Sequence, residues 1–221
     1  MKKFLRAILM ILVATGLTAC SNDTESEVAD GSDSGAASTN VELSENVLVA
    51  YFTEPEETGT DALAGASRVV EEGEVVGSTQ FLAQTISEET GGELFRIETV
   101  QEYPADHDEL VDQGDQEQSE DARPELTAEI ENLADYDTIF VGYPNWFSDL
   151  PMPMYTFFES HDFAGKTIIP FSTHGGSGLS GTIETIGDLQ PEATVYGNAL
   201  SISRSEVADS RHEVVDWVNG I

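Results

Sequence analysis

The amino-acid sequence predicts an α/β domain in which a five-stranded parallel sheet carries helices on both faces. Short apolar runs, rich in β-branched and aromatic residues, recur along the chain, as expected for strands buried on both sides. Segments with the apolar spacing of helices separate these runs. Alternating strands and helices form parallel sheets with right-handed crossovers, so the predicted domain is doubly wound.

The stretch 137–147 (DTIFVGYPNWF) organises this interpretation. Its first part is short, uncharged and β-branched, which predicts a central strand. Its second part presents a proline, an amide and two aromatic residues where a flat ligand would lie, beyond the carboxyl end of that strand. The alternative is an ordinary turn with Trp146 packed in the core. The predicted strands are 47–52, 93–100, 138–142, 167–172 and 193–201.

Helices are predicted between these strands. The first begins near Gly77 and stops at a pair of glycines, Gly91 and Gly92. Two more are expected between residues 104 and 134, an acidic surface helix and a second one after Pro124 with its apolar residues on one face. The remaining predicted helices are 152–160, a segment that ends near Leu189, and a final helix capped by Ser205.

Residues 54–76 are acidic and lack sustained periodicity, although they separate the first strand from the first clear helix. Loops of this length are uncommon inside compact domains and tend to be functional. We therefore expect either a lid over the neighbouring site or a surface insertion.

The N-terminus has the anatomy of a secretory signal. Residues 1–19 combine a basic start, an apolar centre too short for a comfortable membrane span, and a small-residue exit. Leu17 to Cys20 (LTAC) resembles the bacterial lipobox, which implies cleavage before Cys20 and lipidation of that cysteine. The alternative is an uncleaved anchor with a chance cysteine. We expect a signal peptide at 1–19, the lipidated Cys20 with a disordered acidic linker over 20–45, and one folded domain over 46–221.

The charge of the chain limits its partners. It has 42 acidic and 9 basic side chains, a formal charge of −33, and loss of residues 1–19 would leave six bases and a charge of −36. Such a surface repels nucleic acid and anionic lipid headgroups. The acidic excess suits solvation, in a salty or alkaline exterior, better than a docking patch. The single cysteine excludes an intramolecular disulfide or a thiol redox pair, and no metal site is predicted.

Three loops follow the first, third and fourth strands and are expected to converge, because these strand ends share one edge of the sheet. The first loop supplies Thr53 and the hydroxyl and amide groups of Gly77, Ser78 and Thr79, at a helix start that favours a phosphate. No lysine or arginine accompanies them in sequence, so a monoester held by hydrogen bonds fits better than a triphosphate. A capped helix with nothing bound is the alternative. The segment 58–60 (TGT) is a less favoured second candidate for the phosphate loop.

These features, in this order, resemble the flavodoxin-like family, in particular its bacterial lipoprotein and oxidoreductase-like branch. The resemblance covers about residues 46–218. It depends on the segments 47–53, 77–79, 136–146, 151–154 and 163–178. It implies a strand order of 2-1-3-4-5 and FMN as cofactor. Two features depart from the pattern of this family. Residues 54–76 split the phosphate loop, and the form of the third loop favours the reductase-like branch.

The resemblance also implies the residues of the FMN site. Thr53, Ser78 and Thr79 would hold the phosphate. The residues that would border the isoalloxazine are Pro144, Asn145, Trp146 and Phe147 on one side, and Thr173, His174, Gly175 and Gly178 on the other. His174 is a candidate proton donor, with a loop-stabilising role as the alternative. His107, His161 and His212 are expected at the surface.

The implied function is a lipid-anchored, extracytoplasmic flavoprotein that passes electrons. It would act as a carrier, or as a reductase of a small acceptor such as a quinone, with a surface redox protein as another partner. The alternative is a non-catalytic binding lipoprotein that has lost FMN and holds another small ligand. We also expect the acidic excess to lower the potential at which bound FMN becomes anionic below that of free FMN, and added salt to raise it.

Overall fold

The computed structural model describes residues 43–44, 46–55, 68–71 and 73–221. The predicted signal peptide, Cys20, nearly all of the predicted linker and the candidate loop 58–60 lie outside the described residues. No helix in the described part of the chain is long and apolar enough to cross a membrane.

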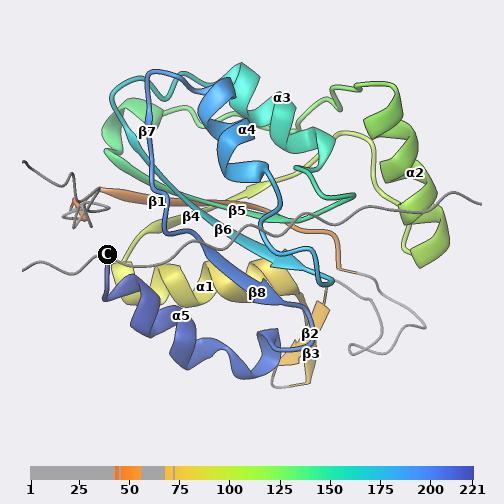
Figure 1. Cartoon of the computed structure of the whole chain (residues 1–221), viewed down its shortest axis with the longest axis horizontal. Helices are drawn as coiled ribbons and strands as arrows, with labels where there is room; N and C mark the ends of the chain where they lie inside the picture. The colour runs from red at the N-terminus through yellow and green to blue at the C-terminus, as the bar shows by residue number, and fades with distance from the viewer. Residues whose placement is uncertain (1–42, 45, 56–67, 72) are drawn as a thin grey trace, which may run out of the picture. The chain divides into compact units, whose positions relative to one another are not determined.

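A parallel sheet forms the centre of the domain (Figure 1). Its order is β4-β1-β5-β6-β7, with β8 also paired to β6, so the predicted order 2-1-3-4-5 is confirmed. The fifth position holds two short strands, which pair with the first and second halves of β6 respectively. The strands are β1 (Val47–Phe52), β4 (Glu93–Ile97), β5 (Thr138–Pro144), β6 (Thr167–His174), β7 (Thr194–Val195) and β8 (Leu200–Ser203).

Helices cover both faces of the sheet, as predicted (Figure 1). One face is covered by α1 (Ser78–Thr90) and α5 (Arg211–Val218), and the other by α3 (Met152–Ser160) and α4 (Thr182–Leu189), with α2 (His107–Ser119) beside α3. Alternate residues of β1 enter the two cores: Val47, Val49 and Tyr51 pack toward α1, while Leu48, Ala50 and Phe52 pack toward α3. Every residue of β1 and β5 is buried, which explains why neither strand contains a charged residue.

The prediction of a helix after Pro124 is wrong. Residues 124–132 run without helical structure, and only a short 3₁₀ turn, η1 (Leu133–Asp135), follows. Thr99 forms an isolated antiparallel bridge with Leu126, and the backbone N–H of Val100 donates to the carbonyl of Glu125 at 2.8 Å. The apolar residues of this segment therefore reach the core from an extended backbone, and this cross-chain pairing replaces helical hydrogen bonds.

Two further boundaries differ from the prediction. Residues 68–77, the described end of the long loop, form a hairpin of β2 (Arg68–Glu71) and β3 (Glu74–Gly77). The last helix is preceded by the 3₁₀ turn η2 (Val207–Asp209) and starts after Ser210, so Ser205 does not cap it. Arg211 ties these parts together, because its guanidinium contacts Glu71 at 2.8 Å and Glu88 at 2.7 Å.

His161 is buried at the end of α3, so its predicted surface position is wrong. Its Nδ1 donates to the carbonyl of Phe157 at 2.8 Å, and its Nε2 accepts from the backbone N–H of Ile130 at 2.9 Å. The imidazole is thus a fully paired core group that fixes the extended segment against α3. His212, as predicted, is exposed.

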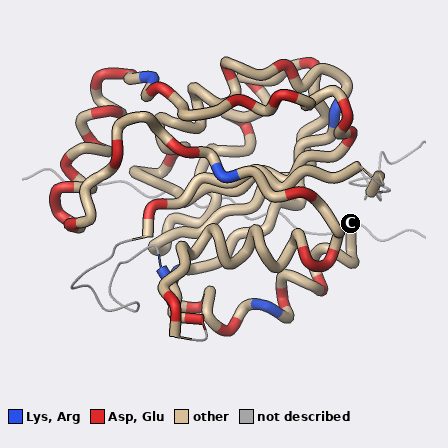
Figure 2. Tube along the Cα trace, turned by 180° about the vertical axis from the view of Figure 1, so that it is seen from behind, with Lys and Arg blue, Asp and Glu red and all other residues tan. Residues whose placement is uncertain are grey.

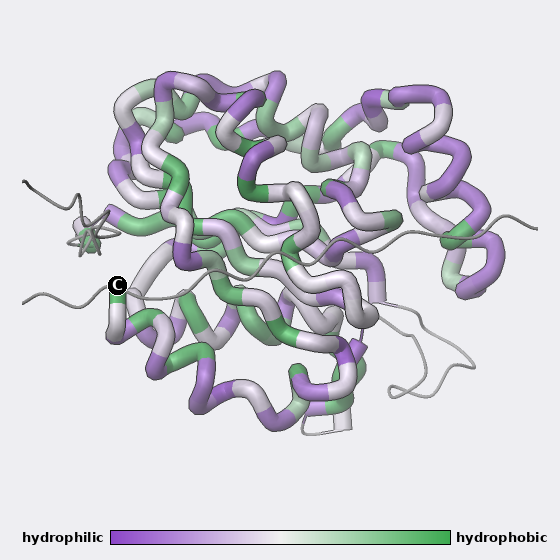
Figure 3. The backbone as a smooth tube through the Cα atoms, viewed as in Figure 1, coloured by the Kyte–Doolittle hydropathy of each residue, from purple (hydrophilic) through white to green (hydrophobic). Residues whose placement is uncertain are grey.

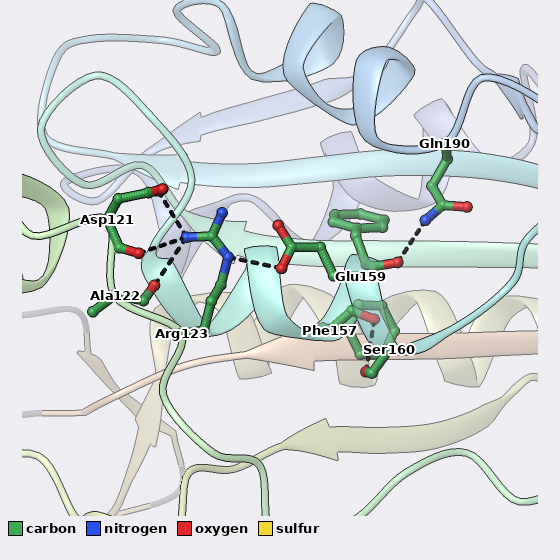
Figure 4. Close-up of polar contacts among 8 residues, drawn as sticks. Asp121, Ala122, Arg123, Phe157, Glu159, Ser160 and Gln190 are labelled. Atoms are coloured by element: carbon green, nitrogen blue, oxygen red, sulfur yellow. Dashed lines mark hydrogen bonds and ion pairs between the residues drawn. The ribbon is translucent and has the colours of Figure 1, made fainter.

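Two further sets of contacts hold helix α3 in place (Figure 4). Arg123 donates to Glu159 at 2.8 Å and to the Asp121 carboxylate at 2.7 Å, which joins the end of α2 to α3. The amide of Gln190 donates to the carbonyl of Phe158 at 2.5 Å, which joins α4 to α3. None of these residues lines the cavity described below, and their contacts have a structural role.

Acidic residues are spread over the helices and loops of the domain, and basic residues are few (Figure 2). Hydrophobic residues concentrate along the strands and the inner sides of the helices, whereas α2 is almost entirely hydrophilic (Figure 3). This distribution agrees with solvation by the acidic residues better than with one acidic docking patch.

Candidate functional site

The start of α1 and the loops that follow β5 and β6 lie at one edge of the sheet and line a cavity of about 180 Å³. The predicted site residues come together there. Eight of the twelve line the cavity: Ser78, Pro144, Asn145, Trp146, Phe147, Thr173, His174 and Gly175. Of the other four, Gly77 and Thr79 flank Ser78 and Thr53 lies against Gly77, while the carbonyl of Gly178 accepts a hydrogen bond from Asn145.

The hydroxyl groups at the start of α1 are buried and only partly paired. Thr53 and Ser78 are fully buried, and neither hydroxyl has a hydrogen-bond partner within the described part of the chain. A buried polar group without a partner costs about 1–3 kcal/mol. The Thr79 hydroxyl is bonded to that of Thr173 at 2.9 Å, which connects the first and third loops. Two free hydroxyls at a helix N-terminus are suited to an anion.

Gly77 is required for this arrangement. A Cβ atom at residue 77 would lie 2.1 Å from the Oγ1 of Thr53, so only glycine lets the two loops approach this closely. Gly77 is the N-cap of α1, and its N–H donates to the Gln80 side chain at 3.3 Å. The hairpin ends at Gly77, so β3 leads directly into the helix start.

The loop after β5 forms an aromatic wall. Trp146 and Asp149 exchange backbone hydrogen bonds of 3.1 and 2.9 Å, and between them Phe147 and Ser148 have positive φ angles of 51° and 66°. Non-glycine residues rarely adopt such angles, and they concentrate at functional sites. Trp146 packs edge-on against Phe52 at 5.5 Å between ring centroids, while Phe147 is 43% exposed.

Asn145 presents an acceptor. Its amide nitrogen donates to the carbonyl of Gly178 at 2.8 Å and its backbone N–H donates to the carbonyl of Thr173 at 2.7 Å. Its side-chain oxygen is buried and has no partner among the described residues. The orientation of the amide is therefore fixed, with the oxygen available to an N–H donor of a ligand.

His174 is held as a neutral imidazole. Its Nδ1 accepts a hydrogen bond from the N–H of Gly176 at 2.9 Å, so the neutral ring carries its proton on Nε2. Burial lowers the pKa of His174, and the nearby Glu206 opposes this only in part. At neutral pH the ring is therefore a potential hydrogen-bond donor without a charge.

The sequence interpretation missed four lining residues, three of which belong to α2. The helix is largely exposed, as predicted, but His107, Leu110 and Val111 line the cavity, a role that the sequence interpretation did not assign to them. Leu110 is buried, and Gly114 one turn further packs against the aromatic loop, where an added Cβ would lie 3.2 Å from Phe147. The few apolar residues of an otherwise acidic helix were the available indication of this contact.

Arg204 is the fourth missed residue. It follows β8 directly, and its backbone N–H donates to the carbonyl of His174 at 2.8 Å. The rule that sites collect residues from the carboxyl ends of parallel strands also applies to this strand, and it would have indicated Arg204.

The family model for flavodoxin matches residues 69–221 of the chain. The chain belongs to the flavodoxin family. This agrees with the sheet order and with the position of the cavity at the carboxyl edge of the sheet. No curated protein matches the chain.

Several solved structures share this flavodoxin fold. A protein from Bacteroides uniformis described as a flavoprotein is 29% identical, with a TM-score of 0.60 over 79% of this chain and 97% of the other. One from Bacteroides eggerthii is 25% identical, with a TM-score of 0.59 over 79% and 96%. A Lactobacillus acidophilus flavoprotein, solved in complex with FMN, is 17% identical, with a TM-score of 0.51 over 75% and 98%. This last likeness shows the fold alone.

Proposed function

We propose that this flavodoxin-family chain binds FMN in the cavity and transfers electrons. The observation that carries the proposal is the pair of buried, unpaired hydroxyls of Thr53 and Ser78 beside the cavity. An FMN phosphate would satisfy both, and the binding of FMN by the Lactobacillus protein of the same fold supports this choice of ligand.

The residues of the chain suit the two ends of FMN differently. At the phosphate end, Thr53 and Ser78 supply hydroxyls and the first turn of α1 supplies free N–H groups. At the ring end, Trp146 and Phe147 supply aromatic surface, and the free side-chain oxygen of Asn145 supplies an acceptor. Bound FMN would provide one-electron and hydride chemistry, which no side chain in the cavity provides.

The chain's own contribution is to position the ligand and control its surroundings. His174 keeps a proton on Nε2 and can donate it in a hydrogen bond to a ligand atom, without adding charge. The exposed Phe147 lies at the edge of the cavity, where an electron acceptor can approach. We propose a small acceptor such as a quinone, or a surface redox protein.

We further propose that the protein is anchored by a lipid on Cys20 and works outside the cytoplasm. The support is the sequence of residues 1–20, with its basic start, apolar centre and lipobox-like end. Membrane attachment would place the domain near quinones. Incorporation of labelled fatty acid into the wild-type chain, but not into a Cys20→Ser variant, tests the anchor. Labelling of both proteins would overturn it.

A visible spectrum tests the cofactor. The soluble chain from residue 21 onward, without the lipidated cysteine, is mixed with FMN, freed of excess ligand and measured, and we expect the absorption bands of bound flavin. Trp146→Ala should lose most of this absorbance because it removes the aromatic wall. A colourless wild-type protein would instead favour another small ligand. Steady turnover of NAD(P)H or quinone by the yellow protein would indicate a reductase, and its absence a carrier.

A further inference from the structure

The lining of the cavity differs from the rest of the molecule in charge. Acidic side chains make up 42 of the 221 residues, yet none lines the cavity in the part of the chain that the structure describes. The titratable residues that do line it are all basic: His107, His174 and Arg204. Among the described residues, the cavity lining is thus free of carboxylates in a chain with a formal charge of −33.

Arg204 supplies the permanent charge of this surface. Burial keeps His174 neutral at neutral pH, whereas a guanidinium stays protonated at all ordinary pH values. The cavity lining thus carries a permanent positive charge. Arg204 is half-buried, so its charge is screened less than that of a fully exposed side chain.

The backbone on either side fixes the position of Arg204. Ser203 pairs with His174 in the parallel ladder of β8 and β6, and the next N–H, that of Arg204, donates to the carbonyl of His174. The guanidinium lies against Gly175, where an added Cβ would be 3.0 Å from Nη1. The third loop therefore leaves room for this side chain next to the cavity.

We propose that Arg204 raises the reduction potential of the flavin bound in this cavity by stabilising the negative charge gained on reduction. The inference rests on the proposed function, because it requires FMN in the cavity. Two electrons and one proton convert the neutral oxidised ring into the reduced anion, so a fixed positive charge favours the reduced state over the oxidised state. Arg204 would offset the opposite effect of the distributed acidic residues.

A potentiometric titration of the full-length protein, loaded with FMN and reduced by dithionite, tests the proposal. For Arg204→Gln we expect the affinity for reduced FMN to fall about tenfold relative to that for oxidised FMN, which equals about 30 mV for a two-electron couple. Arg204→Met, which removes the charge but keeps an extended apolar stem, should lower the potential equally. Arg204→Lys should retain most of the wild-type potential.

Lys166→Gln is the matched control, because it removes one positive charge just before β6 begins, at the opposite end of that strand from His174. It should leave the potential nearly unchanged. Equal potentials for Arg204→Gln, Arg204→Met and the control would overturn the proposal, as would an equal loss of affinity for oxidised and reduced FMN. Failure of the wild-type protein to bind FMN would instead overturn the proposed function, before any variant is compared.

Discussion

Thr53 and Ser78 are unusual among the buried hydroxyls at this edge of the sheet. The neighbouring Thr79 and Thr173 hydroxyls bond to each other, and that of Thr182 accepts from Tyr143 at 2.7 Å. Thr53 and Ser78 have no such partner in the described part of the chain. Natural proteins rarely leave buried polar atoms unpaired, so these two are best explained by a ligand.

Thr53→Val should therefore have opposite effects on stability and binding. Without ligand, the free energy of unfolding should rise by about 1 kcal/mol, because an unpaired buried hydroxyl becomes a methyl group. The affinity for FMN should fall about tenfold, because one phosphate contact is lost. Denaturant unfolding of the ligand-free protein and a fluorescence titration with FMN measure both quantities.

Thr85→Val is the matched control, since Thr85 is equally buried in α1 but its hydroxyl already donates to the carbonyl of Phe81 at 2.9 Å. This change should lower stability and leave the affinity for FMN unchanged. An unaltered affinity in the Thr53 variant would argue against a phosphate at this hydroxyl.

Glu54, the next residue, gives a prediction about pH. Burial raises its pKa from 4.5 to about 7, with Arg96 opposing the shift and Glu98 adding to it. A raised carboxyl pKa means that the folded state binds the proton more tightly, so stability is fully present below about pH 4.5 and is lost as pH rises through 7. Glu54→Gln should thus stabilise the protein by about 1–2 kcal/mol at pH 8, after allowance for partial exposure, and have little effect at pH 4. Thermal unfolding across this range measures the difference, and an equal gain at both pH values would contradict the ionisation argument.

At the scale of elements, the hairpin β2–β3 and the helix α2 both contribute to a site that the sheet alone would leave open. The hairpin ends in Gly77, the N-cap of α1, and α2 packs its one buried glycine against the aromatic loop. The two elements approach opposite ends of the proposed ligand.

The hairpin register places Arg68 beside the start of α1. Arg68 is directly opposite Gly77, and opposed residues of an antiparallel pair project to the same face of the ribbon. On this face, a Cβ at Gly77 would meet Thr53. We therefore expect Arg68→Gln to weaken FMN binding about tenfold and to leave riboflavin binding unchanged, because only FMN carries the phosphate.

Isothermal titration of both ligands tests this prediction about Arg68. Arg123→Gln, which removes the same charge from the surface contact with Glu159, serves as control and should change neither affinity. A parallel loss for FMN and riboflavin in the Arg68 variant would mean that the hairpin acts on the shape of the site and not on the phosphate.

Gly114 lies inside α2, where glycine costs about 1 kcal/mol relative to alanine. Its advantage is the close approach of the helix to Trp146 and Phe147, which a Cβ would meet at 3.4 and 3.2 Å. Gly114→Ala should displace the aromatic loop and reduce FMN affinity about threefold to tenfold, in spite of the better helix propensity.

Gly187→Ala provides the comparison for Gly114, because Gly187 is also helical but an added Cβ there meets no atom within 4 Å. This variant should gain about 1 kcal/mol of stability and bind FMN normally. If both variants bind FMN equally well, the packing of α2 on the aromatic loop does not control the site.

At the scale of the whole molecule, the dominant feature is the formal charge of −33 of the full chain, whose acidic residues are spread over the helices and loops of the described part (Figure 2). Repulsion among these carboxylates opposes the folded state, and the same field opposes reduction of a flavin to an anion. Both effects act over distances that salt shortens, from a Debye length of about 30 Å at 0.01 M to about 3 Å at 1 M.

Raising the salt concentration over this range should therefore increase the melting temperature by several degrees and raise the potential of bound FMN. Arg204→Gln should show a lower potential at every salt concentration, because Arg204 lines the cavity and its charge is screened less than the charges on the exposed surface. Calorimetry and potentiometry at matched salt concentrations measure the two responses. A potential independent of salt would show that the acidic surface has no influence on the flavin.

Much of the fold was predictable because strand patterns are local. Predominantly apolar runs identified β1, β5 and β6, since a strand buried on both faces carries few polar and no charged side chains. The candidate site followed from these strands, because parallel strands end at one edge and the residues after them must be neighbours. This reasoning from the sequence places Thr53, Trp146 and His174 at one edge of the sheet.

The remaining features depend on contacts between segments far apart in the chain. The spacing of Leu126, Ile130 and Leu133 suits a helix, but the bridge to Thr99 and the hydrogen bond to His161 hold this segment extended. Arg204 gains its position from the pairing of β8 with β6. Local sequence thus determined which strands form and where their loops meet, whereas tertiary pairing and packing decided how non-periodic segments run and which distant side chains complete the cavity.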